Sequence, residues 1–305
     1  MCDTQSMSQE GIYDFLEVLE LEKGTCDTLG VFKGANDFWI HYRGWQPEGD
    51  PQAVLVLAHG YAEHSGRYAH VADYFVNQGY AVYALDHRGH GKSDGKRGYF
   101  ERFQFLVDDL DKFVTVVRAI GGVGSLFLVG HSMGGLLSAA YTIQHPDGVD
   151  GLVLSGAGVK VGEDVSPLLR AMSGVISALL PRMGVTQLEA AAISRDPQVV
   201  ARYDSDPLNY RGKVPARVGA EMLKTARWVM REAHAIACPV LIMHGTADKL
   251  ANPTGSRELY EAVSSSDKTL KLWDGLYHEI FNEPEKERVL AFMRDWLAER
   301  TSRRF

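Results

Sequence analysis

The chain has 305 residues, 45% of them hydrophobic, and a formal net charge of −7 at neutral pH. That length and apolar content can bury a large core, and the mixed acidic and basic residues form no basic stripe of the kind that binds nucleic acid. The three cysteines, Cys2, Cys26 and Cys238, are an odd number, which disfavours a disulfide framework and fits a reducing compartment.

Residues 1–29 are rich in acidic side chains and lack the basic-then-apolar order of a secretion signal. We therefore expect a cytoplasmic protein with an N-terminal extension over 1–29. Apolar residues between positions 12 and 19 have the spacing of a short amphipathic helix, whereas residues 18–22 suit a strand. The sequence leaves both alternatives open.

Short apolar runs separated by turns predict eight strands, near residues 28–33, 37–43, 53–58, 80–85, 125–130, 150–155, 238–244 and 268–273. Helical periods lie between several of them, most clearly over 103–117. Strands that alternate with helices predict an α/β fold, with a mostly parallel eight-stranded sheet covered by helices on both faces.

The strand that ends near residue 130 passes directly into Gly130-His131-Ser132-Met133-Gly134 and then into an apolar helical stripe. Small residues on both sides of a serine suit a sharp strand-to-helix turn, because backbone approaches backbone there. Such a turn exposes the serine, so Ser132 is the candidate nucleophile. The alternative is a glycine-rich turn with an incidental serine.

A serine at neutral pH needs a histidine base and an acid that orients it. Asp248 lies just beyond a buried strand, and His278 follows the last predicted strand. The order Ser132, Asp248, His278 is that of the α/β-hydrolase fold. Asp267 and Asp274 are rival acids, but Asp274 is close in sequence to the histidine and Asp267 precedes a strand. No Cys/His cluster has the spacing of a metal site, so we expect no metal.

The oxyanion of an acyl-transfer intermediate requires hydrogen-bond donors, and two backbone amides suffice. One is expected from Met133, the residue after the nucleophile. The other is expected from Tyr61, because His59-Gly60-Tyr61 follows the third predicted strand. An ordinary strand-end turn is the alternative for His59 and Gly60.

About 80 residues separate the sixth predicted strand from the seventh, far more than a usual connection. This length predicts a cap over 159–235, inserted after strand 6 between the core segments 30–158 and 236–305. An apolar stripe at helical spacing comprises Leu168, Leu169, Met172, Val175, Ile176, Leu179, Leu180 and Met183.

Small residues between these positions favour contact with an acyl chain or a lipid surface. We expect four of them to line the substrate cavity: Leu169, Met172, Ile176 and Leu179. The stretch is too short to span a bilayer, but it allows peripheral membrane contact. Plain packing on the main domain is the alternative.

Four segments together resemble the monoacylglycerol lipases: His59–Tyr68, Gly130–Gly135, His244–Asp248 and Tyr277–Glu283. The likeness runs from about Gly30 to Trp296 and is looser over 160–235. It implies a serine esterase that removes the fatty acyl chain from a monoacylglycerol without a cofactor. It also implies that Glu63, Arg67 and Tyr203 lie at the glycerol end of the pocket; alternatively, Glu63 and Arg67 pair with each other.

Two other classes of function are compatible with the same fold. A broad carboxylesterase or a lysophospholipase would share the triad and differ only in the cap. A hydrolase-fold binding protein without catalysis belongs to another class, but such proteins typically lack a triad member, and this chain has all three in order. Hydrolases of this fold that use an aspartate nucleophile are disfavoured because serine occupies that position.

Overall fold

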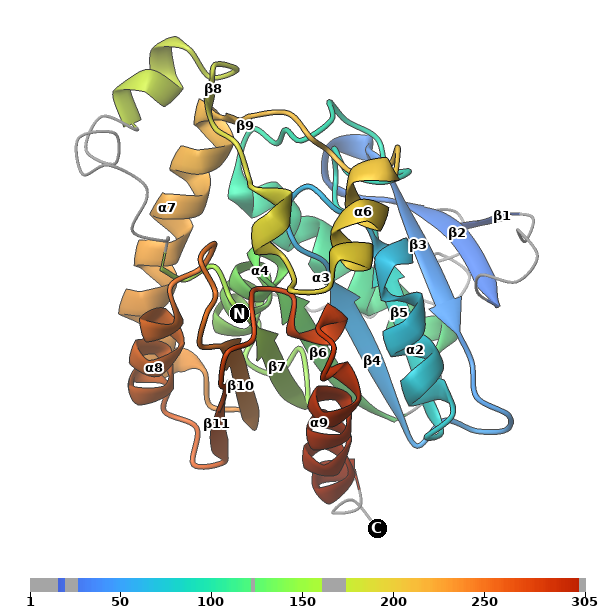
Figure 1. Cartoon of the computed structure of the whole chain (residues 1–305). Coiled ribbons are helices and arrows are strands. Elements are labelled where there is room, and N and C mark those ends of the chain that lie inside the picture. The colour runs from blue at the N-terminus through green and yellow to red at the C-terminus, as the bar shows by residue number, and fades with distance from the viewer. Residues whose placement is uncertain (1–15, 20–26, 122–123, 161–173, 302–305) are drawn as a thin grey trace, which may run out of the picture.

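The computed structural model describes residues 16–19, 27–121, 124–160 and 174–301. A central sheet has the spatial order β1-β2-β3-β5-β4-β6-β7-β10-β11 (Figure 1). Its strands are β1 (Leu16–Leu19), β2 (Thr28–Lys33), β3 (Trp39–Trp45), β4 (Ala53–Ala58), β5 (Tyr80–Leu85), β6 (Ser125–His131), β7 (Gly151–Ser155), β10 (Val240–Gly245) and β11 (Lys268–Trp273). The strands from β5 to β11 in that order pair in parallel, and β1, β2 and β3 form an antiparallel edge. The predicted α/β fold with a mostly parallel sheet is confirmed.

All eight predicted strands are present, and β1 adds one more at the antiparallel edge. The strand covers residues 16–19 and overlaps the predicted strand at 18 and 19, whereas residues 12–15 and 20–22 of the two alternatives lie outside the described residues. The pairing of β1 with β2 explains the strand, because an edge strand presents a row of backbone donors and acceptors that another strand can satisfy.

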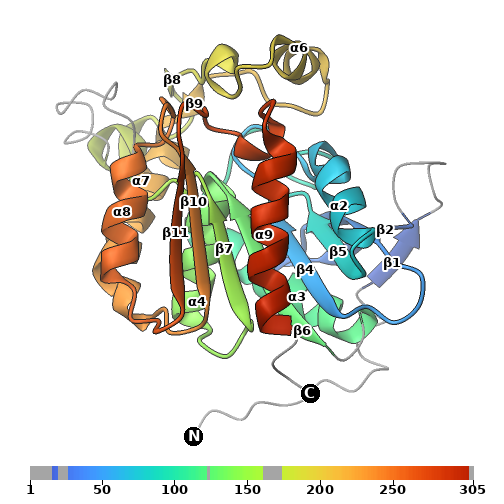
Figure 2. The same cartoon turned by 60° about the horizontal axis from the view of Figure 1, so that its bottom comes forward.

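Helices cover both faces of the sheet. They include α2 (Ala69–Val76), α3 (Phe103–Ile120), α4 (Met133–Gln144), α7 (Ala216–Glu232), α8 (Pro253–Ala262) and α9 (Lys286–Thr301). Helix α9 lies on one face of the sheet, opposite α3 and α4 (Figure 2). The apolar core on one face contains side chains of α3, α4 and α7, and the core on the other contains those of α2 and α9. Alternate residues of β4 enter the two cores, Val54 and Val56 the first and Leu55 and Leu57 the second. This period of two is expected of a strand buried on both faces.

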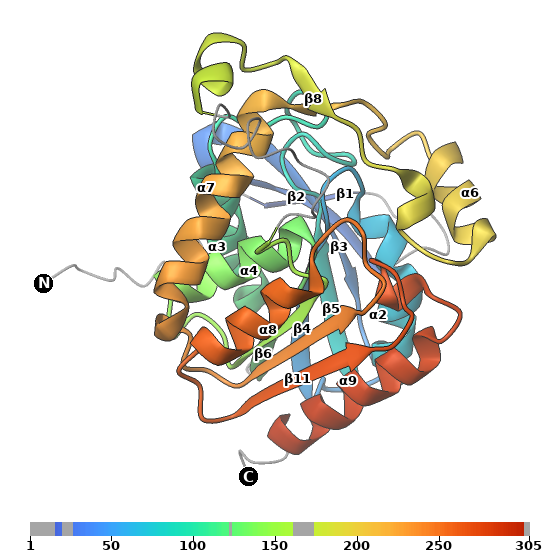
Figure 3. The ribbon, with the colours of Figure 1, turned by 60° about the vertical axis from the view of Figure 1, so that its left-hand side comes forward.

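The segment between β7 and β10 contains a group of short elements above the carboxyl ends of the parallel strands (Figures 1 and 3). These are β8 (Gly184–Thr186), η3 (Ala190–Ala192), α6 (Pro197–Ser205) and β9 (Val214–Pro215). Helix α7 follows them, and its Val218, Ala226 and Val229 belong to the main core. The range 159–235, predicted as a cap, thus contains a helix that packs on the core. No helix within the described ranges is both long and apolar enough to cross a bilayer.

Candidate active site

Ser132 occupies a strained turn between β6 and α4. Its φ of 55° and ψ of −117° lie in a region that residues with a side chain rarely adopt. A Cβ on Gly134 would overlap the backbone carbonyl of Ala58, and a Cβ on Gly130 would overlap the carbonyl of Gly134. The two glycines are therefore required by the close approach of backbone segments around the serine. The Ser132 amide donates to the carbonyl of Ser155 at 3.0 Å, which anchors the turn to β7.

His278 and Asp248 form a buried pair beyond the ends of β11 and β10. The distance from His278 Nδ1 to Asp248 Oδ2 is 2.6 Å. The other carboxylate oxygen, Oδ1, accepts hydrogen bonds from the backbone amides of Leu250 at 2.8 Å and Ala251 at 3.0 Å. These bonds fix the acid, and the acid fixes the imidazole ring so that Nε2 remains for other contacts.

Charge and burial act in opposite directions on this pair. Burial alone would raise the pKa of Asp248, but the charges of and hydrogen bonds from His278 and His244 hold it well below the ordinary value. Burial alone would lower the pKa of His278, but the Asp248 carboxylate, with smaller effects from Glu279 and Glu63, raises it. The carboxylate is therefore ionised at neutral pH and stabilises a proton on the histidine.

Ser132 and His278 line the same cavity. Within the described residues no hydrogen bond joins Ser132 Oγ to His278, and such bonds are often longer before substrate binds. The rival acids lie elsewhere. Asp274 is exposed and accepts a bond from Thr246 Oγ1 at 3.2 Å, and Asp267 pairs with Arg300.

His244 is a second partner of the acid that the sequence did not reveal. Its Nε2 lies 2.9 Å from Asp248 Oδ2, and its Nδ1 lies 2.7 Å from Ser256 Oγ. The signal was a histidine four residues before the acid, at the end of a buried strand. His131 also contacts the site, with its ring centroid 4.7 Å from that of His278. Burial and the charge of His278 lower the pKa of His131 to about 3, so it is neutral.

Tyr61 and Met133, whose amides are the expected oxyanion donors, adjoin residues close to the nucleophile: Met133 follows Ser132 in sequence, and a Cβ built on Gly60 would lie 3.2 Å from Ser132 Cβ. Met133 is the first residue of α4, where a backbone amide has no acceptor within the helix. Tyr61 lies in the turn after β4, and two contacts hold that turn. Glu63 Oε1 accepts from the Gly60 amide at 2.6 Å, and the Tyr61 hydroxyl donates to the carbonyl of Gly98 at 2.8 Å. The two amides remain the candidate donors to an oxyanion.

The cavity of about 180 Å³ has a predominantly apolar wall between the sheet and the segment above it. Its apolar lining includes Ile176, Val185, Leu188, Ile193, Val214, Met222, Leu223 and Leu250. Of the four stripe residues expected there, Ile176 lines the cavity. Leu179 does not: its side chain is 75% exposed, because its side of the helix over 174–179 faces away from the cavity. Leu169 and Met172 lie outside the described residues.

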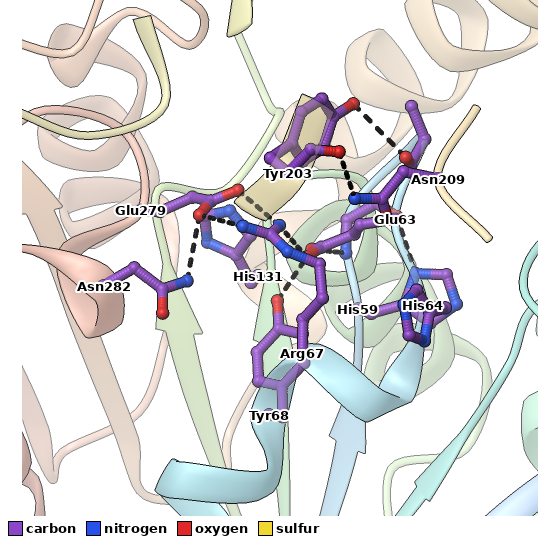
Figure 4. A network of polar contacts seen from close by, with 12 residues as sticks. His59, Glu63, His64, Arg67, Tyr68, His131, Tyr203, Asn209, Glu279 and Asn282 are labelled. Atoms are coloured by element: carbon purple, nitrogen blue, oxygen red, sulfur yellow. Dashed lines mark hydrogen bonds and ion pairs between the residues drawn. The ribbon is translucent and has the colours of Figure 1, made fainter. Parts of the chain in front are cut away.

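A buried polar network adjoins the cavity (Figure 4). The Arg67 guanidinium lies between two carboxylates: Nη1 is 2.6 Å from Glu63 Oε2, and two parallel bonds of 2.7 Å join Nη1 and Nη2 to Glu279. It also lies 4.9 Å from the centroid of the Tyr203 ring. Glu63, Tyr203 and Glu279 line the cavity, and Arg67 is not among its lining residues. The pairing of Glu63 with Arg67, one of the alternatives from the sequence, is present.

Glu279 is a further residue that the sequence did not single out. Burial raises the pKa of Glu63, whereas for Glu279 the charge of Arg67 outweighs burial and lowers the pKa. The only sequence signal was a carboxylate directly after the candidate histidine. Its arginine partner is 212 positions away, so no local pattern connects the two.

The chain is similar in sequence and in fold to several known proteins. A family model described as "Serine aminopeptidase, S33" matches residues 49–285. A monoacylglycerol lipase of Mycolicibacterium smegmatis is 42% identical over 87% of this chain and 95% of its own length. The mouse monoglyceride lipase is 32% identical over 87% and 89% of the two chains. The crystal structure of a monoacylglycerol lipase from Paleococcus ferrophilus superposes with a TM-score of 0.78 at 32% identity, covering 86% of this chain and 99% of the other.

Proposed function

We propose a mechanism and a substrate for this chain on the premise that it belongs to the monoacylglycerol lipase family, within the serine hydrolases of the α/β-hydrolase fold. The chain is a serine ester hydrolase that splits monoacylglycerols into fatty acid and glycerol. The proposal rests chiefly on one observation. The strained Ser132 and the Asp248-bound His278 line one largely apolar cavity beneath the segment between β7 and β10.

In the proposed reaction, His278 Nε2 takes the proton of Ser132 Oγ as the oxygen attacks the ester carbonyl carbon. The amides of Tyr61 and Met133 hold the oxyanion of the tetrahedral intermediate. His278 returns the proton to the departing glycerol oxygen, which leaves an acyl group on the serine. A water molecule that loses its proton to His278 then attacks the acyl carbonyl, and the fatty acid is released as the proton returns to Ser132.

The cavity wall supports a division between the two parts of the substrate. Its apolar side chains, including Ile176, suit an acyl chain, because apolar surface leaves water there. Glu63 and Tyr203 are the residues that we assign to the glycerol end, where a carboxylate accepts from hydroxyl groups. Arg67 acts there only indirectly, since its guanidinium is already bonded to two carboxylates.

A hydrolysis panel tests the substrate. Monoacylglycerols with short and long chains, a diacylglycerol, a triacylglycerol and a lysophospholipid are compared by fatty acid release, with Ser132→Ala as the background control. We expect monoacylglycerols to be the preferred substrates and the Ser132→Ala variant to lose at least about 10⁴-fold in turnover. A triacylglycerol preference, or near-normal turnover by the variant, contradicts the proposal.

We also propose a cytoplasmic enzyme that contacts membranes peripherally through the end of the 174–179 helix. Val175, Leu179, Leu180 and Met183 are exposed there, while Ile176 of the same helix lines the cavity. Exposed apolar groups beside a lipid-ester site suit insertion among acyl chains. Sedimentation with phosphatidylcholine vesicles should weaken for Leu179→Asp and stay unchanged for Ser266→Asp, which adds the same charge to an exposed position before β11. Equal binding by both variants contradicts this contact.

A further inference from the structure

Two of the candidate catalytic groups lie on loops that are far apart in sequence. The turn after β4 carries the Tyr61 amide, and the loop after β11 carries His278. The 3-10 helix η2 (Ser65–Tyr68) provides Arg67, which bonds to a carboxylate of each loop (Figure 4). A single side chain thus connects the two loops.

The two loops are connected by a continuous series of short hydrogen bonds. The Gly60 amide donates to Glu63 Oε1 at 2.6 Å, Arg67 donates to Glu63 Oε2 at 2.6 Å, and Arg67 donates twice to Glu279 at 2.7 Å. The Glu279 amide in turn donates to the carbonyl of Ile193 at 2.8 Å, in the segment above the cavity. Gly60 immediately precedes the Tyr61 amide, and Glu279 immediately follows His278, so both ends of the series adjoin the reacting groups.

Burial restricts the movement of the side chains in this series of hydrogen bonds. The side chains of Glu63, Arg67 and Glu279 are 3%, 10% and 6% exposed. Buried charges are stable only when oppositely charged partners bond to them with good geometry. The loss of one partner would leave an uncompensated charge in the interior. Arginine suits the position because its planar fork bonds a carboxylate at two points, which a lysine ammonium does not do.

We propose that Arg67 and Glu279 are positioning residues that hold His278 at its working distance from the oxyanion amide of Tyr61. The inference rests on the proposed function, since it requires His278 to act as the base. Arg67 acts through Glu63 on one loop and through Glu279 on the other. Its guanidinium is bonded to both carboxylates and does not line the cavity, so its contribution is to orientation and not to contact with the ester.

The charge of Glu279 gives a second signature. The groups that act on His278 are Asp248 beyond β10, Glu279 on its own loop, Glu63 beyond β4, and the neutral His131 at the end of β6. Burial lowers the pKa of His278, and the three carboxylates raise it. Removing the Glu279 charge lowers that pKa, whereas replacing Arg67 by lysine keeps every charge.

The test uses the full chain with Glu279→Gln and Arg67→Lys. The matched controls are Asp267→Asn and Arg300→Lys, which alter another arginine–aspartate pair, at the amino end of β11. The initial rates on a soluble short-chain monoacylglycerol give kcat, KM and the pH profile of kcat/KM. Fluorophosphonate labelling of Ser132 reports the nucleophile independently of the substrate.

We expect kcat to fall about 10- to 100-fold in both test variants with KM within about threefold, because small displacements of a catalytic group cost rate rather than binding. The acidic limb of kcat/KM should move to lower pH in Glu279→Gln and stay in place in Arg67→Lys. The controls should keep the wild-type kcat and pH profile.

Three outcomes overturn the positioning role: wild-type kcat in both test variants, a raised KM at unchanged kcat, or an equal kcat loss in the controls. If Glu279→Gln does not fold, the Arg67→Lys comparison still decides, because lysine preserves the charge. A wild-type protein that neither hydrolyses the substrate nor labels at Ser132 refutes the proposed function instead.

Discussion

Replacing Asp248 by asparagine removes one charge and keeps the shape of the acid. The amide oxygen retains the two backbone bonds from Leu250 and Ala251, so the loop after β10 keeps its anchor. The amide nitrogen then takes the place of Oδ2, which faces His278 Nδ1 at 2.6 Å and His244 Nε2 at 2.9 Å. An amide nitrogen donates, so His278 Nδ1 must accept and the ring proton moves to Nε2.

That tautomer cannot take the proton of Ser132, because the nitrogen left for the serine already carries one. A serine triad with this substitution loses about 10⁴-fold in kcat, equivalent to about 5 kcal/mol of transition-state stabilisation. KM should change little, since the side chain does not line the cavity. The expected loss is therefore almost wholly in kcat.

The assay measures kcat on a soluble monoacylglycerol and the rate of fluorophosphonate labelling, with thermal unfolding to verify the fold. Asp274→Asn is the matched control, because this exposed acid contacts Thr246 and not His278. We expect the control to retain the wild-type rate. A folded Asp248→Asn variant within tenfold of the wild-type kcat, or a greater loss in Asp274→Asn, refutes the assignment of the acid.

Two further predictions concern pH and packing. The pKa of His278 is raised above its ordinary value, and only the neutral ring accepts the serine proton. We therefore expect kcat/KM to fall as the pH drops through a pKa above about 6.5. An acidic limb well below pH 6 in the wild type contradicts this expectation. Gly134→Ala places a Cβ against the carbonyl of Ala58 and should lower the free energy of unfolding by about 1–3 kcal/mol in urea. In α7, a Cβ added at Gly219 would have Val214 at 3.9 Å as its nearest neighbour, so Gly219→Ala should raise the free energy of unfolding by up to about 1 kcal/mol. The reverse ranking of the two variants argues against the close packing described for the turn around Ser132.

Much of the fold followed from local chemistry. The eight strands were predictable because each is a short apolar run between turns, and the mostly parallel sheet followed from their alternation with helices. The ninth strand, β1, was ambiguous, because the apolar residues between 12 and 19 have helical spacing whereas residues 18–22 suit a strand. Only the free edge of β2 decided it.

The structure of the segment between β7 and β10 was less predictable from the sequence. Its apolar stripe was visible in the sequence, but the side that each residue faces depends on what packs against the helix. Ile176 lines the cavity, whereas Leu179, three residues later, is exposed. Helix α7, which lies within the range expected for the cap, packs against the core and also lines the cavity with Met222 and Leu223.

The sequence by itself determined the strand-to-helix turn around Ser132 and the order of the candidate triad, and it revealed the resemblance to a lipase family. These features depend on neighbouring residues and on positions at strand ends. The tertiary structure alone decided which acid bonds to His278, which histidine supports that acid, and which carboxylates hold Arg67. Those contacts join loops far apart in the chain. Their geometry comes from the packing of the whole sheet and its helices, which no local periodicity encodes.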